Sequence, residues 1–261
     1  MVEIRNALKE KLDAGGMALG VGLRGARTVD IARAMRTAGF DWLFIDMEHS
    51  AIDIDSAANV SVAAQDAGIT PIVRVPGFEH HHATRVLDGG AQGIVVPHVD
   101  DVETAKRMVR NVRYPPLGHR SMYGASPQAA FEAHPQGELM EALNRGTFLI
   151  LMIESPEAVK AADDIAAIEG VDALLIGTSD LTSEMGIPGQ YDHPDVVAAY
   201  ETVIAACRRH GKHPGMGGVY SPPVMKRYVE MGMRLILSGS EFSFMMAGAR
   251  AQSAAVRALL G

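Results

Sequence analysis

Short apolar runs recur along the chain and alternate with longer segments whose apolar residues follow a helical spacing. Runs rich in Val, Ile and Leu that are apolar throughout are typical of parallel strands buried on both faces. The pattern predicts strands at 18–21, 42–46, 72–75, 93–97, 148–153, 173–177, 214–217 and 235–238.

The segments between these runs carry helix signals. Ser155-Pro156 and Ser221-Pro222 each place a capping residue before a proline at the first helical position, and Gly232 ends the second of these helices. Eight strand-helix units in 261 residues favour an α/β fold, a single (β/α)8 TIM barrel over residues 1–261. A doubly wound sheet normally has a glycine-rich turn after its first strand, and residues 20–25 match that turn only loosely.

Composition narrows the class of protein. No apolar run approaches the roughly 18 to 20 residues of a membrane span, and residues 1–16 predict a short amphipathic helix and no signal peptide. The net charge is −7 and the basic residues are scattered, which argues against nucleic acid. The single cysteine, Cys207, is expected to be a buried apolar residue. We therefore expect a soluble, cytoplasmic protein whose partner is a small molecule.

In a barrel of this kind the chemistry lies at the carboxyl ends of the strands. The polar residues at these predicted ends are Asp46, Glu48, His49, Arg74, His98, Glu154, Ser179 and Asp180.

Glu154 and Asp180 end two adjacent predicted strands. A buried pair of carboxylates is stable when a proton or a cation neutralises it, and oxygen ligands favour Mg²⁺ or Mn²⁺ over Zn²⁺. The alternative, which spacing alone leaves open, is that both acids cap helices.

The second and third strand ends supply a candidate base and a cation. Asp46 precedes His49 closely enough to hold its imidazole as a general base, although such a histidine is as often structural. Arg74 interrupts an apolar run, so it should meet an anion, either Glu48 or a neighbouring acid, or an oxyanion of the substrate.

The sequence leaves the roles of several further residues and segments undetermined. Candidates for reading a second substrate are Arg24, Arg27, His119, Arg120 and Tyr123, and Arg24 is equally interpreted as a solvated loop arginine. The run His80–His82 resembles a metal cluster, but consecutive helical residues point in different directions. The long connection 113–146 predicts a lid or a subunit contact. The apolar segment 242–260 predicts core or a helix packed on another subunit.

Five ordered motifs resemble those of a known family. They are Phe-Ile-Asp-Met-Glu-His at 44–49, Pro-Ile-Val-Arg-Val at 71–75, Pro-Pro-Leu-Gly-His-Arg at 115–120, Ile-Glu-Ser-Pro at 153–156 and Ile-Gly-Thr-Ser-Asp-Leu at 176–181. Together they are similar to the metal-dependent class II pyruvate aldolases that act on 4-hydroxy-2-oxoheptanedioate and 2-keto-3-deoxy sugar acids.

The resemblance implies a modified barrel whose last helix is exchanged between subunits of a homotrimer or homohexamer. It implies that Glu154 and Asp180 bind Mg²⁺, Mn²⁺ or Co²⁺, which a 2-keto acid chelates, and that backbone at Ser179 and Asp180 holds the substrate carboxylate. His49 matches the family base and Arg74 the residue that stabilises the enolate oxygen. Asp88 matches an acid that reaches this base from a neighbouring subunit.

Two positions depart from the family pattern. Met152 stands where many relatives have Gln, and Leu23-Arg24 stands where many have Trp. The second departure falls in the part of the site that would hold the aldehyde. There Arg24 is a candidate ligand for a distal carboxylate or hydroxyl group.

The expected reaction is the reversible cleavage of a 4-hydroxy-2-keto acid to pyruvate, or hydroxypyruvate, and an aldehyde. The enolate of pyruvate needs an electron sink, which is either a lysine Schiff base or a metal with a nearby cation. None of the six lysines falls at a predicted strand's carboxyl end, and Lys212 lies just before the seventh strand, so the metal route is favoured. The alternatives are an acyl-CoA thioester lyase and a ligand-binding barrel without catalysis.

Overall fold

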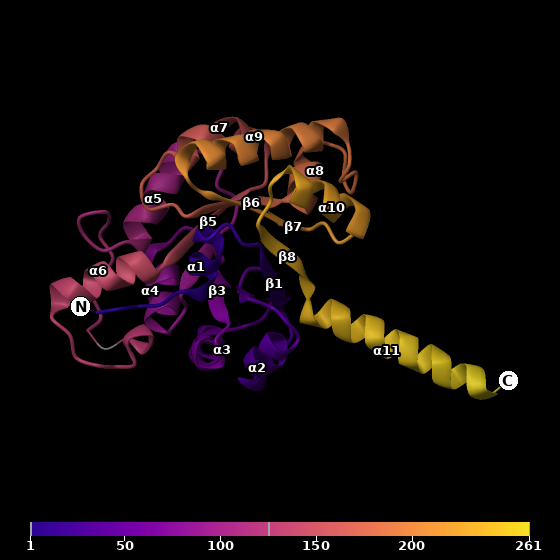
Figure 1. The fold of residues 1–261 in the computed structure, drawn as a ribbon, viewed down its shortest axis with the longest axis horizontal. Coiled ribbons are helices and arrows are strands. Elements are labelled where there is room, and N and C mark those ends of the chain that lie inside the picture. The colour runs from indigo at the N-terminus through magenta and orange to yellow at the C-terminus, as the bar shows by residue number, and fades with distance from the viewer. Residues whose placement is uncertain (1, 125, 261) are drawn as a thin grey trace.

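The computed structural model describes residues 2–124 and 126–260, and its strands form a closed barrel in the order β1 to β8 (Figure 1). Each strand pairs in parallel with the next, and β8 pairs back onto β1. The strands are β1 (Ala18–Leu23), β2 (Trp42–Asp46), β3 (Thr70–Arg74), β4 (Gly93–Val96), β5 (Phe148–Ile153), β6 (Ala173–Gly177), β7 (His213–Gly217) and β8 (Leu235–Ser240). The predicted (β/α)8 TIM barrel is confirmed.

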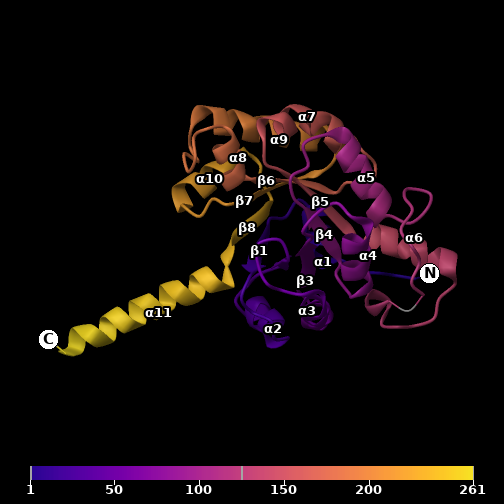
Figure 2. The same cartoon turned by 180° about the vertical axis from the view of Figure 1, so that it is seen from behind.

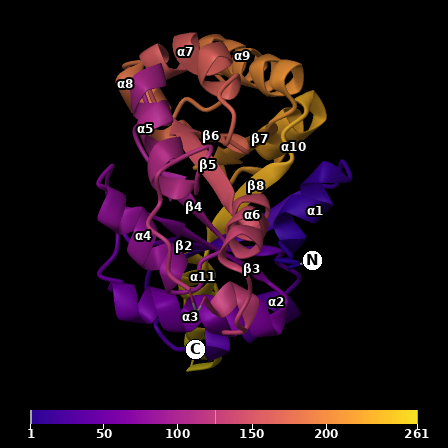
Figure 3. The same cartoon turned by 90° about the vertical axis from the view of Figure 1, so that its left-hand side faces the viewer.

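Helices surround this barrel, as the side view in Figure 3 shows. The α-helices are α1 (Ala7–Asp13), α2 (Asp30–Thr37), α3 (Ile54–Ala67), α4 (His80–Asp88), α5 (Val102–Val112), α6 (Gln136–Gly146), α7 (Pro156–Ala166), α8 (Thr178–Glu184), α9 (Pro194–His210), α10 (Pro222–Met231) and α11 (Glu241–Arg257). Two short 3-10 helices complete the elements, η1 (Pro127–Ala129) and η2 (Ala258–Leu260).

The elements follow the predicted order, with small shifts at their ends. The third strand begins at Thr70, before the predicted position, and the last strand continues to Ser240. The amino-terminal helix is shorter than predicted because Asn6 caps it, accepting a hydrogen bond from the Lys9 amide at 3.2 Å. Met1, where that prediction started, lies outside the described residues.

The inside of the barrel is filled by side chains at alternating strand positions. On β2, Trp42 and Phe44 belong to the interior cluster, and Leu8 and Leu12 of α1 join that cluster. Gly20 makes room for the indole, because a Cβ at this residue would lie 2.2 Å from Trp42 Cε2. The same alternation places Asp46 next on the inward side of β2, at its carboxyl end.

Helix α11 leaves the barrel after β8 and extends away from it, as the front and back views show (Figures 1 and 2). None of its residues is buried, and Phe242, Phe244, Met245 and Val256 are exposed apolar side chains. The prediction that this segment is core is therefore wrong for a single chain, whereas a subunit contact agrees with its exposure. Among the described residues, no helix is long and apolar enough to cross a membrane.

The long connection 113–146 contains η1 and α6 and makes a small core of its own. Tyr114, Leu139 and Leu143 pack there with Val2 from the amino-terminal segment. This connection is thus anchored to the barrel's side, and the predicted alternative of a lid gains no support from its packing.

Candidate active site

A cavity of about 290 Å³ opens at the carboxyl ends of the strands. Its lining includes side chains from both halves of the sequence, namely Arg24, Phe44, His49, Arg74, Met152, Ser179, Asp180 and Tyr220. A second cavity of about 270 Å³ adjoins it through Asp180 and is lined also by His98, Asp100 and Glu154. The sequence therefore placed most of the candidate residues at the correct end of the barrel.

Arg74 is the buried cation of this end of the barrel. Its Nε and Nη2 lie 3.0 and 2.7 Å from the two carboxylate oxygens of Asp46, and its Nη1 lies 2.8 Å from Glu48 Oε2. The guanidinium carbon also lies 5.0 Å from the centre of the Phe44 ring. Glu48, the predicted partner, and its neighbour Asp46 thus both pair with Arg74, and because Arg74 lines the cavity, it also faces any ligand there.

Asp46 organises the turn after β2 and does not hold the His49 ring. Its Oδ1 accepts the backbone N–H groups of Glu48 and His49 at 3.1 Å each, and its Oδ2 accepts Arg24 Nε at 3.1 Å. Burial raises the pKa of Asp46, but the hydrogen bonds from Arg74 and the backbone outweigh burial and lower the pKa below its usual value.

The predicted Asp46–imidazole contact is therefore corrected. An acid two or three residues before a turn is well placed to accept the turn's backbone N–H groups, and here it does so. The His49 side chain is about half exposed at the cavity, and Glu48 Oε2 lies 3.9 Å from its Nε2. The ring is therefore open to a ligand in the cavity.

Glu154 is a buried carboxylate with one unsatisfied oxygen. Its Oε2 accepts the backbone N–H of His98 at 2.8 Å, whereas its Oε1 has no hydrogen-bond partner within the described residues. Burial raises the pKa of Glu154 to about 7, and the charge of Asp180 acts in the same direction. Gly177 faces this side chain, because a Cβ there would lie 2.4 Å from Oε1.

The helix-capping alternative fails for Glu154. Ser155 caps α7, since its Oγ accepts the Ala158 N–H at 3.0 Å, and this leaves Glu154 free of that task. Asp180 lies in the first turn of α8 and lines both cavities. The two acids thus share one small region.

This carboxylate pair fits a hard divalent cation. The donor set is two carboxylates, one of them with a buried and unpaired oxygen, and such an oxygen is stabilised by a proton or by a cation. Within residues 2–124 and 126–260 there is no cluster of three or more His, Cys, Asp or Glu that could hold a metal ion. Any ion at Glu154 and Asp180 would take its remaining ligands from water or substrate.

His98 is a member of the site to which the sequence assigned no role. It follows β4 with a φ of 52°, in the left-handed region that non-glycine residues rarely adopt. Its Nε2 lies 3.4 Å from Glu48 Oε1 and its Nδ1 lies 3.5 Å from Glu154 Oε2. The imidazole thus connects the carboxylate beside Arg74 with the carboxylate beside Asp180. The only sequence signal was its place at a strand end.

Asp88 lies apart from His49 in a single chain. It is the last residue of α4, and its Oδ1 accepts Arg120 Nη2 at 2.7 Å. The Arg120 guanidinium lies 4.7 Å from the centre of the Tyr114 ring and is buried. Arg120, a candidate for the second substrate, therefore belongs to this pair and not to the cavity.

The remaining candidates fall in different places. Arg24 lines the cavity at the end of β1, whereas Arg27 bonds the Gly25 carbonyl oxygen on the exposed surface at 2.9 Å. His119 and Tyr123 are exposed, and neither lines the two cavities.

Three other expectations concern residues outside the catalytic constellation. The run His80–His82 lies in the first turn of α4. Cys207 is buried as predicted, and burial raises the pKa of its thiol to about 12. The six lysines lie away from the two cavities, and Lys212 donates to the Val171 carbonyl oxygen just before β7.

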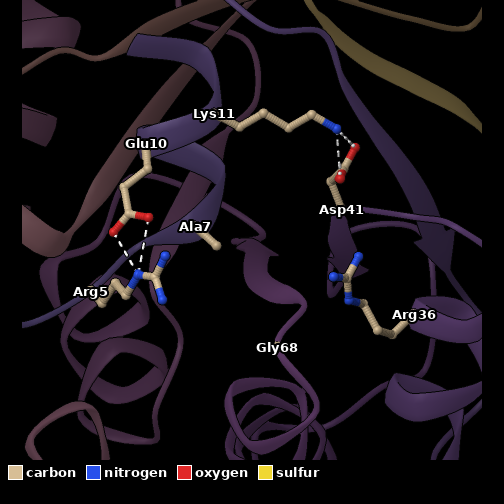
Figure 4. Close-up of a pocket in the computed structure, with 7 residues that line it drawn as sticks. All are labelled: Arg5, Ala7, Glu10, Lys11, Arg36, Asp41 and Gly68. Carbon is tan, nitrogen blue, oxygen red and sulfur yellow. Dashed lines mark hydrogen bonds and ion pairs between the residues drawn. The ribbon is translucent and has the colours of Figure 1, made fainter. Parts of the chain in front are cut away.

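A cavity of about 350 Å³ lies elsewhere on the barrel, beside α1 (Figure 4). Its charges are largely paired: Arg5 meets Glu10 at 2.9 Å, and Lys11 meets Asp41 at 2.8 Å. Asp41 precedes β2, so this cavity is at the amino-terminal end of the strands, where barrels of this type carry stabilising contacts. The carboxyl-terminal cavity is therefore the candidate site.

Comparison with known proteins points to one family. The sequence model described as HpcH/HpaI aldolase/citrate lyase matches residues 24–235. A 4-hydroxy-4-methyl-2-oxoglutarate aldolase of Hapsidospora irregularis is 36% identical, over 99% of this chain and 97% of that protein. A hydroxypyruvate/pyruvate aldolase of Agrobacterium fabrum is 33% identical, over 95% of this chain and 92% of that protein. The crystal structure of an HpcH/HpaI aldolase from Desulfitobacterium hafniense superposes with a TM-score of 0.91 at 32% identity, covering 97% of both chains.

Proposed function

Since this chain belongs to the HpcH/HpaI aldolase/citrate lyase family and is a lyase with the aldolase barrel, we propose that it reversibly cleaves a 4-hydroxy-2-oxo acid to pyruvate, or hydroxypyruvate, and an aldehyde. The observation that carries this proposal is the constellation at one end of the barrel. A buried, unsatisfied carboxylate, Glu154, lies near Asp180, and Arg74 and the half-exposed His49 line the adjoining cavity.

We propose that Glu154 and Asp180 hold a divalent cation, Mg²⁺ or Mn²⁺, with Co²⁺ as a further candidate. When bound, such an ion supplies a Lewis acid for the oxo oxygen of the substrate. The support is the unpaired Oε1 of Glu154, the space that Gly177 leaves beside it, and the all-oxygen donor set.

Arg74 is proposed to stabilise the negative oxygen that forms when the C3–C4 bond breaks and its electrons pass into the enolate. Its two carboxylate partners keep it charged and fix its orientation before substrate binds. The backbone at Ser179 and Asp180 is proposed to hold the substrate carboxylate, because the first turn of α8 lines the cavity and the N–H groups of a helix's first turn lack partners within the helix.

His49 is proposed to take the proton of the C4 hydroxyl group, directly or through water. Its ring lines the cavity and is half exposed, which suits a group that must meet substrate. Asp46 acts on it through the backbone, by fixing the turn that carries it. Asp88 of a neighbouring copy is proposed to orient the ring, since the Asp88 of the same chain lies at the end of α4 and pairs with Arg120 and not with His49.

The proposed assembly is a homotrimer or homohexamer in which α11 packs against a neighbouring subunit. The exposed apolar side chains of α11 support it. A cytoplasmic location is also proposed, since the single cysteine is buried and the chain forms no disulfide of its own.

Exchange of the pyruvate methyl protons in D₂O tests the reaction, because only a site that forms the enolate exchanges them. We expect exchange in the wild type with Mn²⁺ and a strong decrease after complete chelation. Arg74→Ala should lower the exchange rate by about 10²- to 10³-fold, and Arg74→Lys, which keeps a charge beside Asp46 and Glu48, should lose less.

Two results would contradict this proposal. Full exchange in Arg74→Ala would remove the oxyanion role of that residue. Exchange that survives chelation, together with inactivation by borohydride plus pyruvate, would indicate a lysine Schiff base.

A further inference from the structure

We propose that Glu241, the first residue of α11, is a positioning residue that fixes Arg24 at the mouth of the active-site cavity. The inference rests on the proposed aldolase function, because it assigns the controlled step to the half of the site that receives the aldehyde. Glu241 itself does not line either cavity, so it would act through the loop that carries Arg24.

The Glu241 carboxylate binds three consecutive backbone N–H groups. Its Oε1 accepts from Arg24 at 2.9 Å, from Gly25 at 2.6 Å and from Ala26 at 2.9 Å. Successive N–H groups that converge in this way form a concave anion site, and hydrogen bonds to an ionised oxygen are about twice as strong as neutral ones. The carboxylate therefore fixes the conformation of the loop after β1.

The same carboxylate is part of the start of α11. Its Oε2 accepts the Phe242 N–H at 2.9 Å, and the residue before it, Ser240, forms a capping box with Ser243. The loop and the helix thus share one side chain, although they are more than 200 residues apart in sequence. A displacement of the start of α11 would move this loop with it.

Arg24 lies in this loop and reaches into the cavity. Its Nε donates to Asp46 Oδ2 at 3.1 Å, and its side chain is about half exposed. Within the described residues, the one hydrogen bond of the Arg24 side chain is made by Nε, which leaves its two Nη groups free to donate to a ligand. Tyr220 lines the same cavity, and the charge of Arg24 lowers the pKa of its phenol against the dominant effect of burial, which raises it.

The two halves of the site share Asp46, whose Oδ2 accepts both Arg24 Nε and Arg74 Nη2, but only the loop that carries Arg24 contacts Glu241. Glu154, Asp180 and Arg74 are held by β3, β5, α8 and their own contacts, none of which includes Glu241. Loss of Glu241 should disturb Arg24 and leave the pyruvate half intact. This separation distinguishes a positioning residue from one that merely supports the fold.

The test compares two readouts in Glu241→Ala. The KM for the acceptor, glyoxylate or glycolaldehyde, in aldol addition with pyruvate should rise roughly 10- to 100-fold, because small displacements of binding groups have effects of this size. Pyruvate deuterium exchange should stay within about twofold of the wild type. Glu241→Gln keeps an oxygen acceptor and should restore part of the loss. The rise in KM should be larger for glyoxylate, whose carboxylate can pair with Arg24.

A double-mutant cycle shows whether Glu241 acts through Arg24. If it does, Glu241→Ala combined with Arg24→Ala should raise the acceptor KM no further than Arg24→Ala alone. Additive effects would overturn the proposal. Ser243→Ala is the matched control, because it removes the capping box of α11 but none of the hydrogen bonds to the loop, and it should leave the acceptor KM unchanged.

The outcomes separate this inference from the proposed function. Equal losses of exchange and acceptor binding in Glu241→Ala, or the same rise in KM in Ser243→Ala, would reduce Glu241 to a structural residue while the aldolase reaction stands. Absence of exchange and of aldol addition in the wild type would instead remove the proposed function.

Discussion

At the scale of single residues, Glu154 is a buried acid whose ionised form is not fully compensated by the described residues. It is about 2% exposed, its Oε1 is unpaired within the described residues, and its pKa is raised to about 7. Burial outweighs the His98 N–H and the charge of Arg74, which favour the ionised form, and a bound cation would add to these two. Burial of the ionised Glu154 carboxylate thus lowers the stability of the folded protein, and binding of a cation would remove this destabilisation. Groups with a shifted pKa of this kind are common at functional sites.

Because ionised Glu154 destabilises the folded state, the stability of the metal-free protein should depend on pH. Below pH 4.5 Glu154 is protonated in both the folded and the unfolded states, and it makes no difference. Between pH 4.5 and 7 the unfolded state releases the proton while the folded state keeps it, so folding becomes less favourable as the pH rises. Above pH 7 the full penalty, about 3 kcal/mol, is present.

Glu154→Gln removes the charge and keeps the shape. Measured by thermal or urea unfolding with a chelator present, the variant should be more stable than the wild type at pH 8, by up to about 3 kcal/mol, and the gap should close toward pH 4.5. A gap that is constant with pH would show that the side chain titrates normally in the folded protein.

It was easier to predict which residues lie at the site than to predict which residues contact one another. The sequence placed Asp46, Arg74 and Glu154 at the correct end of the barrel, because a polar residue after an apolar strand is visible without a structure. It assigned Asp46 to the His49 ring, whereas the structure uses this acid for Arg74 and for the turn. The contacts of His98 and Glu241 join segments far apart in the chain, which no local pattern records.

At the scale of elements, the strands were predictable, whereas the environment of the last helix stayed open. A strand buried on both faces is an apolar run, and burial against α-helices outside and side chains inside produces that run in most of the strands, although not in β7. Helix α11 has apolar residues around much of its circumference, and this pattern fits a core as well as an interface. Only the structure shows that, within the described residues, no residue of α11 is buried, although Phe244 near its start stacks on Phe40.

The exposure of α11 predicts that its apolar face is buried in the assembly. Met245→Asp combined with Val256→Asp places two charges on exposed apolar positions of the helix, far from the active-site cavity. A charge in an interface must be desolvated, so the variant should lose its neighbours. Light scattering after size-exclusion chromatography should report a lower molar mass than for the wild type.

A matched variant separates assembly from solubility. Thr202→Asp introduces a charge on an exposed position of α9 and should leave the molar mass unchanged. If the α11 variant keeps the wild-type mass, the helix does not form the contact. If Asp88 serves a neighbouring site, the lower-mass variant should also lose activity.

At the scale of the whole molecule, the two ends of the barrel have opposite characters. At the amino-terminal end, Leu8 and Leu12 fill the interior and the pair Lys11–Asp41 lies at the surface. At the carboxyl-terminal end, the inward positions become charged, and Arg74 is surrounded by acids. The amino-terminal end of the barrel thus stabilises the fold, and the carboxyl-terminal end carries the charged groups that can bind a ligand.

This division predicts that the proposed cation stabilises the whole protein through one pair of residues. A ligand that binds only the folded state adds RT ln(1 + [L]/Kd), about 2.7 kcal/mol at 100 times the Kd, which corresponds to a rise in Tm of roughly 5–10 °C for a chain of this size. Mn²⁺ at pH 8 should raise the Tm of the wild type but not that of Glu154→Gln or Asp180→Asn.

Asp100→Asn is the control, because Asp100 lines the same cavity and accepts a hydrogen bond from Ser155, and it should respond as the wild type does. An equal response in Glu154→Gln would place the cation elsewhere. With chelator, Glu154→Gln should be more stable than the wild type. With saturating Mn²⁺, the difference in Tm between the two proteins should shrink or reverse, because the carboxylate that destabilises the metal-free protein is the one that binds the ion.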